Sequence, residues 1–533
     1  MRSSLALVLL VLSGSIAFAD SLSEQIDRII RQQAGMVPIS PPADDDEFLR
    51  RVTLDFAGRI PTEREIRAFR ADRDPNKRPR TIDALTQGPE YAKQMASWMH
   101  QMWMERLGDH PAWQLYLQQA FATNRPWRTM AAEMLRGQSS NATDVGAVFF
   151  LAKRLENYGQ VPVDHSALTR DIGRLFLGVD LRCAECHDHL TIPDYKQDDF
   201  VGLAAFTRNA ALLDAKQPSI REKPLTEKLE FASVFTKVRK QSGPRIPGRS
   251  ELTIPAQPKG SEFRIPPDAK AKTPGTLRFS PLEQLSVEIT AADHRQFARN
   301  FVNRLWFALL GHGLVHPLDL HHRGNPPSHP QVLERLTDAF LASGTDIREL
   351  ARIIARTDAY QRSSILPNGI TQAAPEDRFV TALEKRLSAE QLFASVLRAT
   401  GEWDRFHTPE MATERTALLA RFQKAFANQP REPEESPEPS LRAALFLSND
   451  PKFLDLLTPR PGNLVARLAA IAPESPAELA ELAFLNVLSR SPDSQEQALV
   501  RQSLPSGPAD VRLKAIQRLV WSLLTSTEFS VNH

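Results

Sequence analysis

The sequence contains only 2 cysteines in 533 residues, too few to build a disulfide framework. It has almost no excess of one charge either, because 66 Lys and Arg stand against 64 Asp and Glu, for a formal net charge of +2. This balance excludes a dedicated nucleic-acid binder with a basic surface, and also an acidic solvating protein. No nucleic-acid partner is therefore expected.

Long apolar runs are missing too. No stretch after the N-terminal region approaches 18 uninterrupted apolar residues, so no transmembrane span is expected in the mature chain. The signatures G-x-S-x-G, G-x-x-x-x-G-K and H-E-x-x-H do not occur, which removes three common enzyme assignments. What remains is an ordinary globular composition, with 42% hydrophobic and 24% charged residues, in a chain long enough for more than one domain.

Residues 1–19 have the pattern of a secretory signal peptide. Arg2 gives a basic start, residues 5–12 are apolar, and Ala17-Phe18-Ala19 is a small-x-small cleavage site. We predict cleavage after Ala19 and a periplasmic or secreted protein. Retention of this peptide as a membrane anchor is the alternative.

The periodicity of apolar residues predicts a mainly α protein, with two helical domains joined by a Pro-rich connector that has a few short strands. The predicted domains are residues 20–210 and 281–533. Ten prolines between Pro218 and Pro281 interrupt the helical pattern, so residues 211–280 form the predicted connector. No fixed-period repeat occurs, which argues against a solenoid.

Two local patterns support the first helical domain. Thr62 and Glu65 have the spacing of a helix capping box. Four large side chains are spaced like the buried face of one helix, although methionine sulfur could also reach a metal; they are Met95, Trp98, Met99 and Met102.

Both cysteines fall in one motif, Cys183-Ala184-Glu185-Cys186-His187. C-x-x-C-H is the attachment pattern of c-type haem, in which the two thiols bind the haem vinyl groups and the imidazole becomes an iron ligand. Attachment takes place outside the cytoplasm, in agreement with the signal peptide. We therefore predict haem c on Cys183, Cys186 and His187, with Asp188 and His189 supporting the iron ligand.

Three other interpretations of the motif stay open. A thioredoxin-like dithiol uses C-x-x-C, but no βαβ pattern surrounds it here. A transition metal ion could be held by the cysteines with His187 or His189 and a distant histidine. The simplest alternative is a short structural disulfide in an exported protein.

The methionines limit the haem interpretation. Of 9 methionines, none lies between Cys186 and Met411, so a small cytochrome c with its methionine ligand shortly downstream is excluded. A sixth iron ligand would come from the methionines in residues 95–134, from a distant histidine, or be absent. An absent ligand would leave an iron open to small molecules.

Five of the 13 histidines lie within residues 312–329, a Gly- and Pro-rich segment that is predicted to be a loop between two helices. For each histidine alone, capping of a helix end is the simpler interpretation, but their density suggests a metal site in which Asp319 orients a ligand. The loop contains His312, His316, His321, His322 and His329. The predicted metal ligands are His187, His189, His316, His321, His322 and His329.

Several longer strings carry a family resemblance: residues 51–62, 124–127, 177–206, 297–306, 325–330, 360–364 and 528–533. On these strings the chain resembles a family of planctomycete secreted proteins that pairs a cytochrome-c-like domain of unknown function with a C-terminal helical domain of unknown function. The resemblance covers nearly the whole mature chain. Many relatives place a separate haem domain ahead of this pair, whereas Leu22 here follows the signal peptide almost directly.

The resemblance does not define an activity. The name "cytochrome-c-like" refers only to the C-x-x-C-H string, and the function of the family is undefined. Cys183, Cys186, His187 and His189 match the family pattern, whereas residues 190–194 depart from its usual Asp-Pro.

Three hypotheses follow for the function. The first is an exported c-type haem protein that transfers electrons to an extracytoplasmic redox partner. The second is a metalloenzyme, or a metal-dependent binding protein, that uses the cysteine motif and the histidine loop. The third is a non-catalytic surface interaction protein with a structural disulfide.

Overall fold

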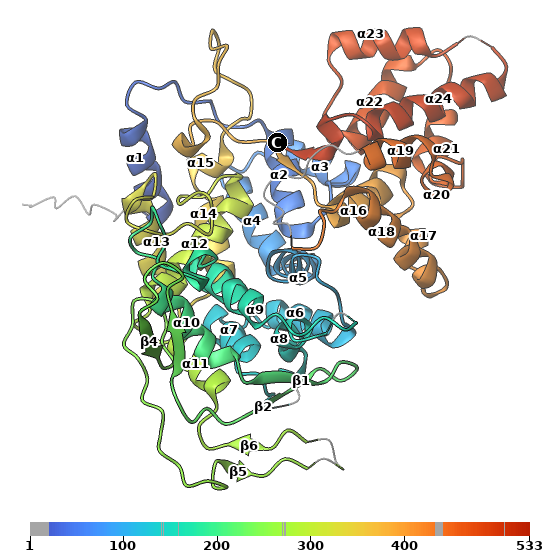
Figure 1. Ribbon diagram of the computed structural model, residues 1–533. Coiled ribbons are helices and arrows are strands. Elements are labelled where there is room, and N and C mark those ends of the chain that lie inside the picture. Colours follow the sequence, from blue (N-terminus) through green and yellow to red (C-terminus); the bar gives the residue numbers. More distant parts are fainter. Residues whose placement is uncertain are drawn as a thin grey trace, which may run out of the picture.

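The computed structural model describes residues 21–139, 141, 143–157, 159–268, 270, 273–431, 441–505 and 507–533 (Figure 1). The predicted signal peptide lies outside the described residues. Within them the chain is mainly helical, with a few short strands in small two-stranded sheets. The mainly α prediction is confirmed.

The N-terminal part of the chain is a series of short helices. They are α1 (Leu22–Ala34), α2 (Asp45–Ala57), α3 (Glu63–Ala71), α4 (Lys77–Gln87), α5 (Pro89–Met104), α6 (Pro111–Ala122), α7 (Trp127–Leu135), η1 (Val145–Val148), α8 (Phe149–Arg154), α9 (His165–Ile172), η2 (Gly173–Leu177), η3 (Cys183–Glu185) and α10 (Gln197–Thr207). The predicted capping box is present at the start of α3. The hydroxyl of Thr62 accepts the backbone N–H of Glu65, and the carboxylate of Glu65 accepts that of Thr62.

The Pro-rich region forms short hairpins. Its strands are β1 (Ala210–Asp214), β2 (Ser219–Glu222), β3 (Leu229–Ala232), β4 (Arg239–Ser242), β5 (Phe263–Ile265) and β6 (Thr276–Leu277). They pair antiparallel as β1–β2, β3–β4 and β5–β6. Frequent prolines leave too few consecutive backbone donors for longer strands.

The helices that follow this region are α11 (Pro281–Ile289), α12 (Arg295–Leu310), α13 (Pro330–Ala342), α14 (Ile347–Ala355) and α15 (Asp358–Gln361). Their apolar faces share one hydrophobic core with α1 to α10. The first hydrophobic core therefore continues past residue 281. The domain boundaries at residues 210 and 281 stay a prediction.

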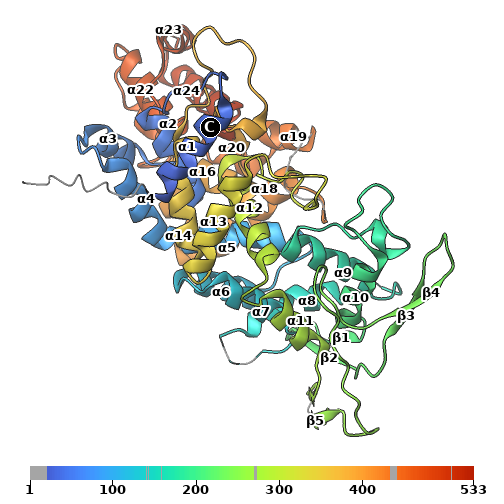
Figure 2. The same ribbon diagram turned by 90° about the vertical axis from the view of Figure 1, so that its left-hand side faces the viewer.

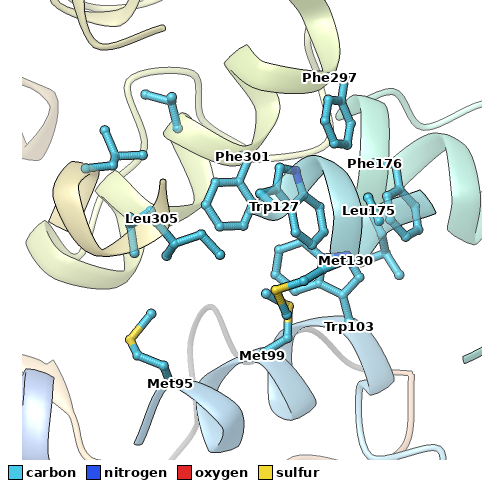
Figure 3. Close-up of a cluster of buried hydrophobic side chains, with 14 of the residues drawn as sticks. Met95, Met99, Trp103, Trp127, Met130, Leu175, Phe176, Phe297, Phe301 and Leu305 are labelled. Carbon is cyan, nitrogen blue, oxygen red and sulfur yellow. The ribbon is translucent and has the colours of Figure 1, made fainter. Parts of the chain in front are cut away.

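At the centre of this first core, Trp127 is 1% exposed and packs against aromatic rings from three directions (Figure 3). Its ring stacks on Phe176, Phe297 and Phe301 with centroid distances of 5.9, 5.6 and 4.6 Å. Met95 and Met99 are buried in the same cluster, so the predicted methionine stripe belongs to the core.

The remaining elements are C-terminal, and most of those after residue 386 contribute to a second hydrophobic core. They are η4 (Glu376–Arg378), β7 (Lys385–Arg386), α16 (Ala389–Thr400), α17 (Trp403–Phe406), η5 (Pro409–Met411), α18 (Ala412–Phe426), α19 (Leu441–Asn449), α20 (Pro451–Asp455), α21 (Leu464–Ala469), α22 (Pro476–Val487), α23 (Ser494–Ser503), α24 (Ala509–Leu524), η6 (Glu528–Ser530) and β8 (Val531–Asn532). Most apolar residues of this second core follow residue 386, but Leu54 and Ile60 from the N-terminal part join it.

The C-terminal residues return to α2, as both ribbon views show (Figures 1 and 2). Arg50 donates to the backbone carbonyls of Phe529 and Val531 at 3.0 and 3.2 Å, and Arg51 donates to that of His533 at 3.2 Å. Both arginines are buried. Because α2 contributes to both cores, these bonds fasten the two parts of the chain together.

Within the described residues, no helix has both the length and the apolar character needed to cross a bilayer. For this part of the chain the expected absence of a transmembrane span is confirmed.

Candidate functional site

The cysteine motif forms a tight turn, η3, between the end of η2 and the start of α10. η2 ends at Leu177 and is followed by Gly178, whose φ of 69° is in the left-handed region. In η3, Ala184 is fully buried, whereas Cys183 and Cys186 are exposed free thiols. The turn thus anchors its middle residue in the core and presents both sulfur atoms to solvent.

Hydrogen bonds hold this turn from both sides. The carboxylate of Asp180 accepts the backbone N–H of Arg182 at 2.9 Å, and Arg170 pairs with Glu185 at 2.6 Å. On the other side, the carbonyl of Cys186 accepts the backbone N–H of Val234, which follows β3, at 3.1 Å. The β3–β4 hairpin is therefore fixed directly beside the thiols.

His187 has one ring nitrogen committed and lies next to an aromatic ring. Its Nδ1 is 2.7 Å from its neighbour's backbone carbonyl, that of Asp188. Donation from Nδ1 to this carbonyl leaves Nε2 as the lone-pair nitrogen, which is the usual arrangement of a metal-ligating imidazole. The ring centroid lies 4.7 Å from that of Phe235.

Asp188 and His189 do not support His187 through their side chains. The carboxylate of Asp188 accepts the backbone N–H of Gln197, at the start of α10, at 3.0 Å, and this bond lowers the pKa of Asp188. Nδ1 of His189 accepts the backbone N–H groups of Thr191 and Ile192 at 3.2 and 3.0 Å. Both side chains stabilise the local chain path after the motif.

Four exposed apolar side chains, called here the exposed apolar surface, follow the motif or lie on the β3–β4 hairpin that contacts it; they were not predicted. Phe235 is 65% exposed, and the other members of this surface are Leu190, Val234 and Val238. Three of them come from the β3–β4 hairpin, which projects from the body of the molecule in Figure 2. In the sequence these residues are visible only as the string Val234-Phe235-Thr236-Lys237-Val238. Only the folded hairpin shows that its apolar side chains are exposed.

The histidine loop does reach the neighbourhood of the motif, through His321 and His322. The backbone N–H of His321 donates to the carbonyl of Gly178, and Tyr195 donates its hydroxyl to the carbonyl of His321 at 3.2 Å. The ring of Tyr195 lies 6.0 Å from that of His189 and 5.7 Å from that of His322. Tyr195 therefore separates the histidine of the motif segment from the loop.

The remaining loop histidines lie around a different residue, Phe379. The ring of His329 lies 5.4 Å from Phe379, and that of His312 lies 6.2 Å from it. The ring centroids of His312 and His316 are 4.2 Å apart. The loop is thus divided into two groups, and only one of them is near the cysteine motif.

Asp319 does not orient a histidine. Its carboxylate forms ion pairs with Arg304 and, at 3.1 Å, with Arg174. Arg174 also pairs with Glu105 and Asp171, and Asp171 pairs with Arg154. This buried network joins the end of α5 with α8, α9, η2 and α12.

In the described part of the chain, no three His, Cys, Asp or Glu side chains are grouped so that they could hold a metal ion. The six histidines that we predicted as metal ligands, His187, His189, His316, His321, His322 and His329, do not form one centre. A transition metal ion as cofactor stays a prediction.

The methionines that could have supplied a sixth iron ligand are core residues. Five of them are less than 5% exposed: Met95, Met99, Met104, Met130 and Met134. The motif turn lies at the surface, so these buried side chains do not face it.

The buried side chain of His321 should make the free energy of unfolding depend on pH. Burial, assisted by Arg299 and Arg304, lowers its pKa to about 3. Between that value and about 6.5 the unfolded chain binds a proton that the folded chain does not, so stability falls as the pH falls. At pH 5 this one group is expected to cost about 2 kcal/mol relative to pH 7.

The variant His321→Leu should flatten the dependence of the unfolding free energy on pH between 7 and 5, as measured by urea titration. His322→Gln is the matched control, because its ring is only partly buried. Equal slopes for wild type and His321→Leu would contradict the assignment.

Comparison with protein families gives two matches. Residues 25–211 match the family described as PSCyt2, a protein of unknown function (DUF1549), and residues 283–436 match PSD1, a protein of unknown function (DUF1553). The first segment contains the motif turn and the second contains the histidine loop. Neither the search of curated proteins nor that of solved structures gave a match.

Proposed function

We propose that this protein is an exported c-type haem protein that exchanges single electrons with an extracytoplasmic redox partner. The observation that carries the proposal is the motif turn: two exposed free thiols three residues apart, followed by a histidine whose Nδ1 faces a backbone carbonyl. The signal-peptide pattern of residues 1–19 supports export, and export is required for this type of haem attachment.

The residues of the turn fit a haem group chemically. Each S–H of Cys183 and Cys186 would add across a vinyl C=C bond, with sulfur bonding the carbon next to the porphyrin and hydrogen going to the other carbon, so no oxidant is consumed. His187 would ligate iron through Nε2. When bound, the haem supplies one-electron transfer between ferrous and ferric iron.

The exposed apolar surface also supports the proposal. Phe235, Val234, Val238 and Leu190 are far more exposed than the apolar residues of the two cores. Val234 donates its backbone N–H to Cys186, and the ring of Phe235 lies against that of His187. Contiguous exposed apolar side chains usually mark a surface that something covers. A planar apolar macrocycle held by the adjacent cysteines would cover it.

The proposal is tested by expression of the full chain in a bacterium that carries a c-type haem attachment system. We expect a band that stains for haem on a denaturing gel, and an intact mass raised by one haem. Cys183→Ser combined with Cys186→Ser should remove the band completely. His187→Ala should change the visible spectrum of any haem that remains.

Cys-to-Ser changes at exposed positions preserve volume, so loss of folding would not explain loss of the stain. His322→Gln serves as the matched control, because Tyr195 lies between His322 and the motif segment. This variant should keep full haem staining. An unstained wild-type protein, from cells in which a known c-type cytochrome stains, would overturn the proposal. An intact mass lower by two hydrogens would then identify the disulfide alternative.

A further inference from the structure

The turn that joins β3 to β4 combines apolar and basic side chains. It comprises residues 233–239, called here the hairpin tip. The backbone N–H of Lys237 donates to the carbonyl of Ser233 at 2.9 Å and closes this turn. The hairpin projects from the body of the molecule (Figure 2), so the tip is the convex end of a narrow element. Its exposed apolar side chains are Val234, Phe235 and Val238.

The two cations of the hairpin tip have no acidic neighbour. Lys237 and Arg239 are exposed and form no ion pair within the described part of the chain. Arg239 lies opposite Ala232 across the hairpin. The single acid of the two strands is Glu230, which lies further from the tip, opposite Gln241. The positive charge of the tip is therefore not neutralised by the hairpin itself.

The neighbouring motif segment does not neutralise it either. Each acidic side chain in residues 180–199 already pairs with a Lys or Arg other than the two cations of the hairpin tip. A partner that supplies negative charge is therefore favoured at the tip. The paired acids are Asp180, Glu185, Asp188, Asp194, Asp198 and Asp199.

The shape of the hairpin tip favours a lipid surface over an acidic protein. A stable protein–protein interface needs about 20–30 residues on each side and a complementary partner surface, and the tip is much smaller. The headgroup region of a bilayer yields to a convex element, so it accepts apolar side chains without a matching cavity. Anionic headgroups attract Lys and Arg that lie close to the membrane.

We propose that the hairpin tip binds the surface of a membrane that contains anionic phospholipid. Val238 and its apolar neighbours enter the headgroup region, while Lys237 and Arg239 contact lipid phosphates. This contact is peripheral and needs no membrane-spanning helix. It goes beyond the proposed haem function and does not rest on it, because the cations carry their charge with or without haem. Since haem would cover apolar side chains of the same surface, the test uses protein without haem.

The experiment is co-sedimentation of the full chain, exported by a bacterium that lacks a c-type haem attachment system, with phosphatidylcholine vesicles that contain or lack phosphatidylglycerol. We expect binding to be at least tenfold tighter when phosphatidylglycerol is present, and to weaken at high salt. The double change Lys237→Gln and Arg239→Gln should weaken it at least tenfold, because each cation near an anionic surface contributes about fivefold. A contribution of residues 1–19 cancels, since every variant carries the same N-terminal sequence.

The β5–β6 hairpin offers matched controls. Lys259→Gln with Arg264→Gln removes the same charge from exposed positions there and should change binding less than twofold. Val238→Ser should weaken binding severalfold, because the apolar side chain no longer enters the headgroup region. Ile265→Ser should not, although Ile265 is 60% exposed and Val238 is 58% exposed.

Two results would overturn the proposal: no preference for vesicles with phosphatidylglycerol, or equal losses in the two charge variants. Binding to soluble polyglutamate but not to the vesicles would also overturn it, and would identify an acidic protein surface as the partner. Haem staining is measured on a separate preparation. A chain that stains but does not bind vesicles contradicts only the membrane proposal, and one that binds them but does not stain contradicts only the haem proposal.

Discussion

Replacement of Trp127 by alanine is expected to lower the free energy of unfolding by about 3–5 kcal/mol, the range found when a large buried aromatic residue is truncated. Trp127 is 1% exposed and stacks on three phenylalanine rings from η2 and α12. Its removal would leave a cavity that rigid neighbouring helices cannot close.

The effect should extend to the motif turn. Phe176, one of the stacked rings, belongs to η2, which ends at Leu177, a few residues before the motif. We therefore expect Trp127→Ala to loosen residues 178–190 in hydrogen exchange, in addition to lowering the urea midpoint. Trp403→Ala is the matched control, because Trp403 is only partly buried. Its ring packs against Arg398 of α16 and against His407, which follows α17. Similar losses in both variants would contradict the central role of Trp127.

Replacement of Arg154 by methionine is expected to destabilise the protein by about 3–5 kcal/mol, because it removes one partner from a buried ion-pair network. The side chain of Arg154 is 0% exposed and pairs with Asp171 at 2.9 Å. It also donates to the backbone carbonyl of Trp103 at 2.7 Å. Methionine fills similar space but satisfies neither acceptor.

The loss caused by Arg154→Met should depend on pH. Burial alone would raise the pKa of Asp171, but attraction by Arg154 and Arg174 outweighs burial and lowers it. This stabilisation is present above the unfolded pKa of about 3.9 and is lost as the pH falls through the folded value. Unfolding by urea at pH 7 and at pH 3.5 should therefore show a smaller difference between wild type and variant at the lower pH.

Arg31→Met is the matched control for this prediction, because Arg31 and Asp358 form an ion pair with both side chains more than half exposed. Exposed pairs of this kind contribute about 0–1 kcal/mol. A comparable loss in the two arginine variants, or a loss in Arg154→Met that does not change with pH, would contradict the network interpretation.

Helical periodicity gave much of the secondary structure, because the pattern of buried side chains repeats locally. The capping box at Thr62 and Glu65 and the buried face with Met95 and Met99 were predicted in this way and are present. The grouping of the helices was not predictable in the same way. α11 to α15 join the core of the N-terminal helices, a long-range choice that local periodicity does not encode.

The candidate site was predicted in part. The motif itself was identified from spacing, because two thiols and an imidazole within five residues are local chemistry. The supporting roles of Asp188, His189 and Asp319 stay predictions. Without the bound group, the side chains of Asp188 and His189 accept backbone N–H groups, and Asp319 pairs with arginines. Hydrogen-bond partners of this kind are decided by which chain segment passes nearby.

The sequence by itself determined a mainly α chain with two cysteines placed next to a histidine, because helix periodicity and motif spacing are properties of neighbouring residues. Only the tertiary structure decided that both thiols are exposed beside Phe235, that the histidine loop divides into two groups, and that apolar and basic side chains project together at the hairpin tip. Each of these features depends on contacts between residues far apart in the chain. The physical reason is that burial, which sets exposure and charge state, is a property of the packed core rather than of any single segment.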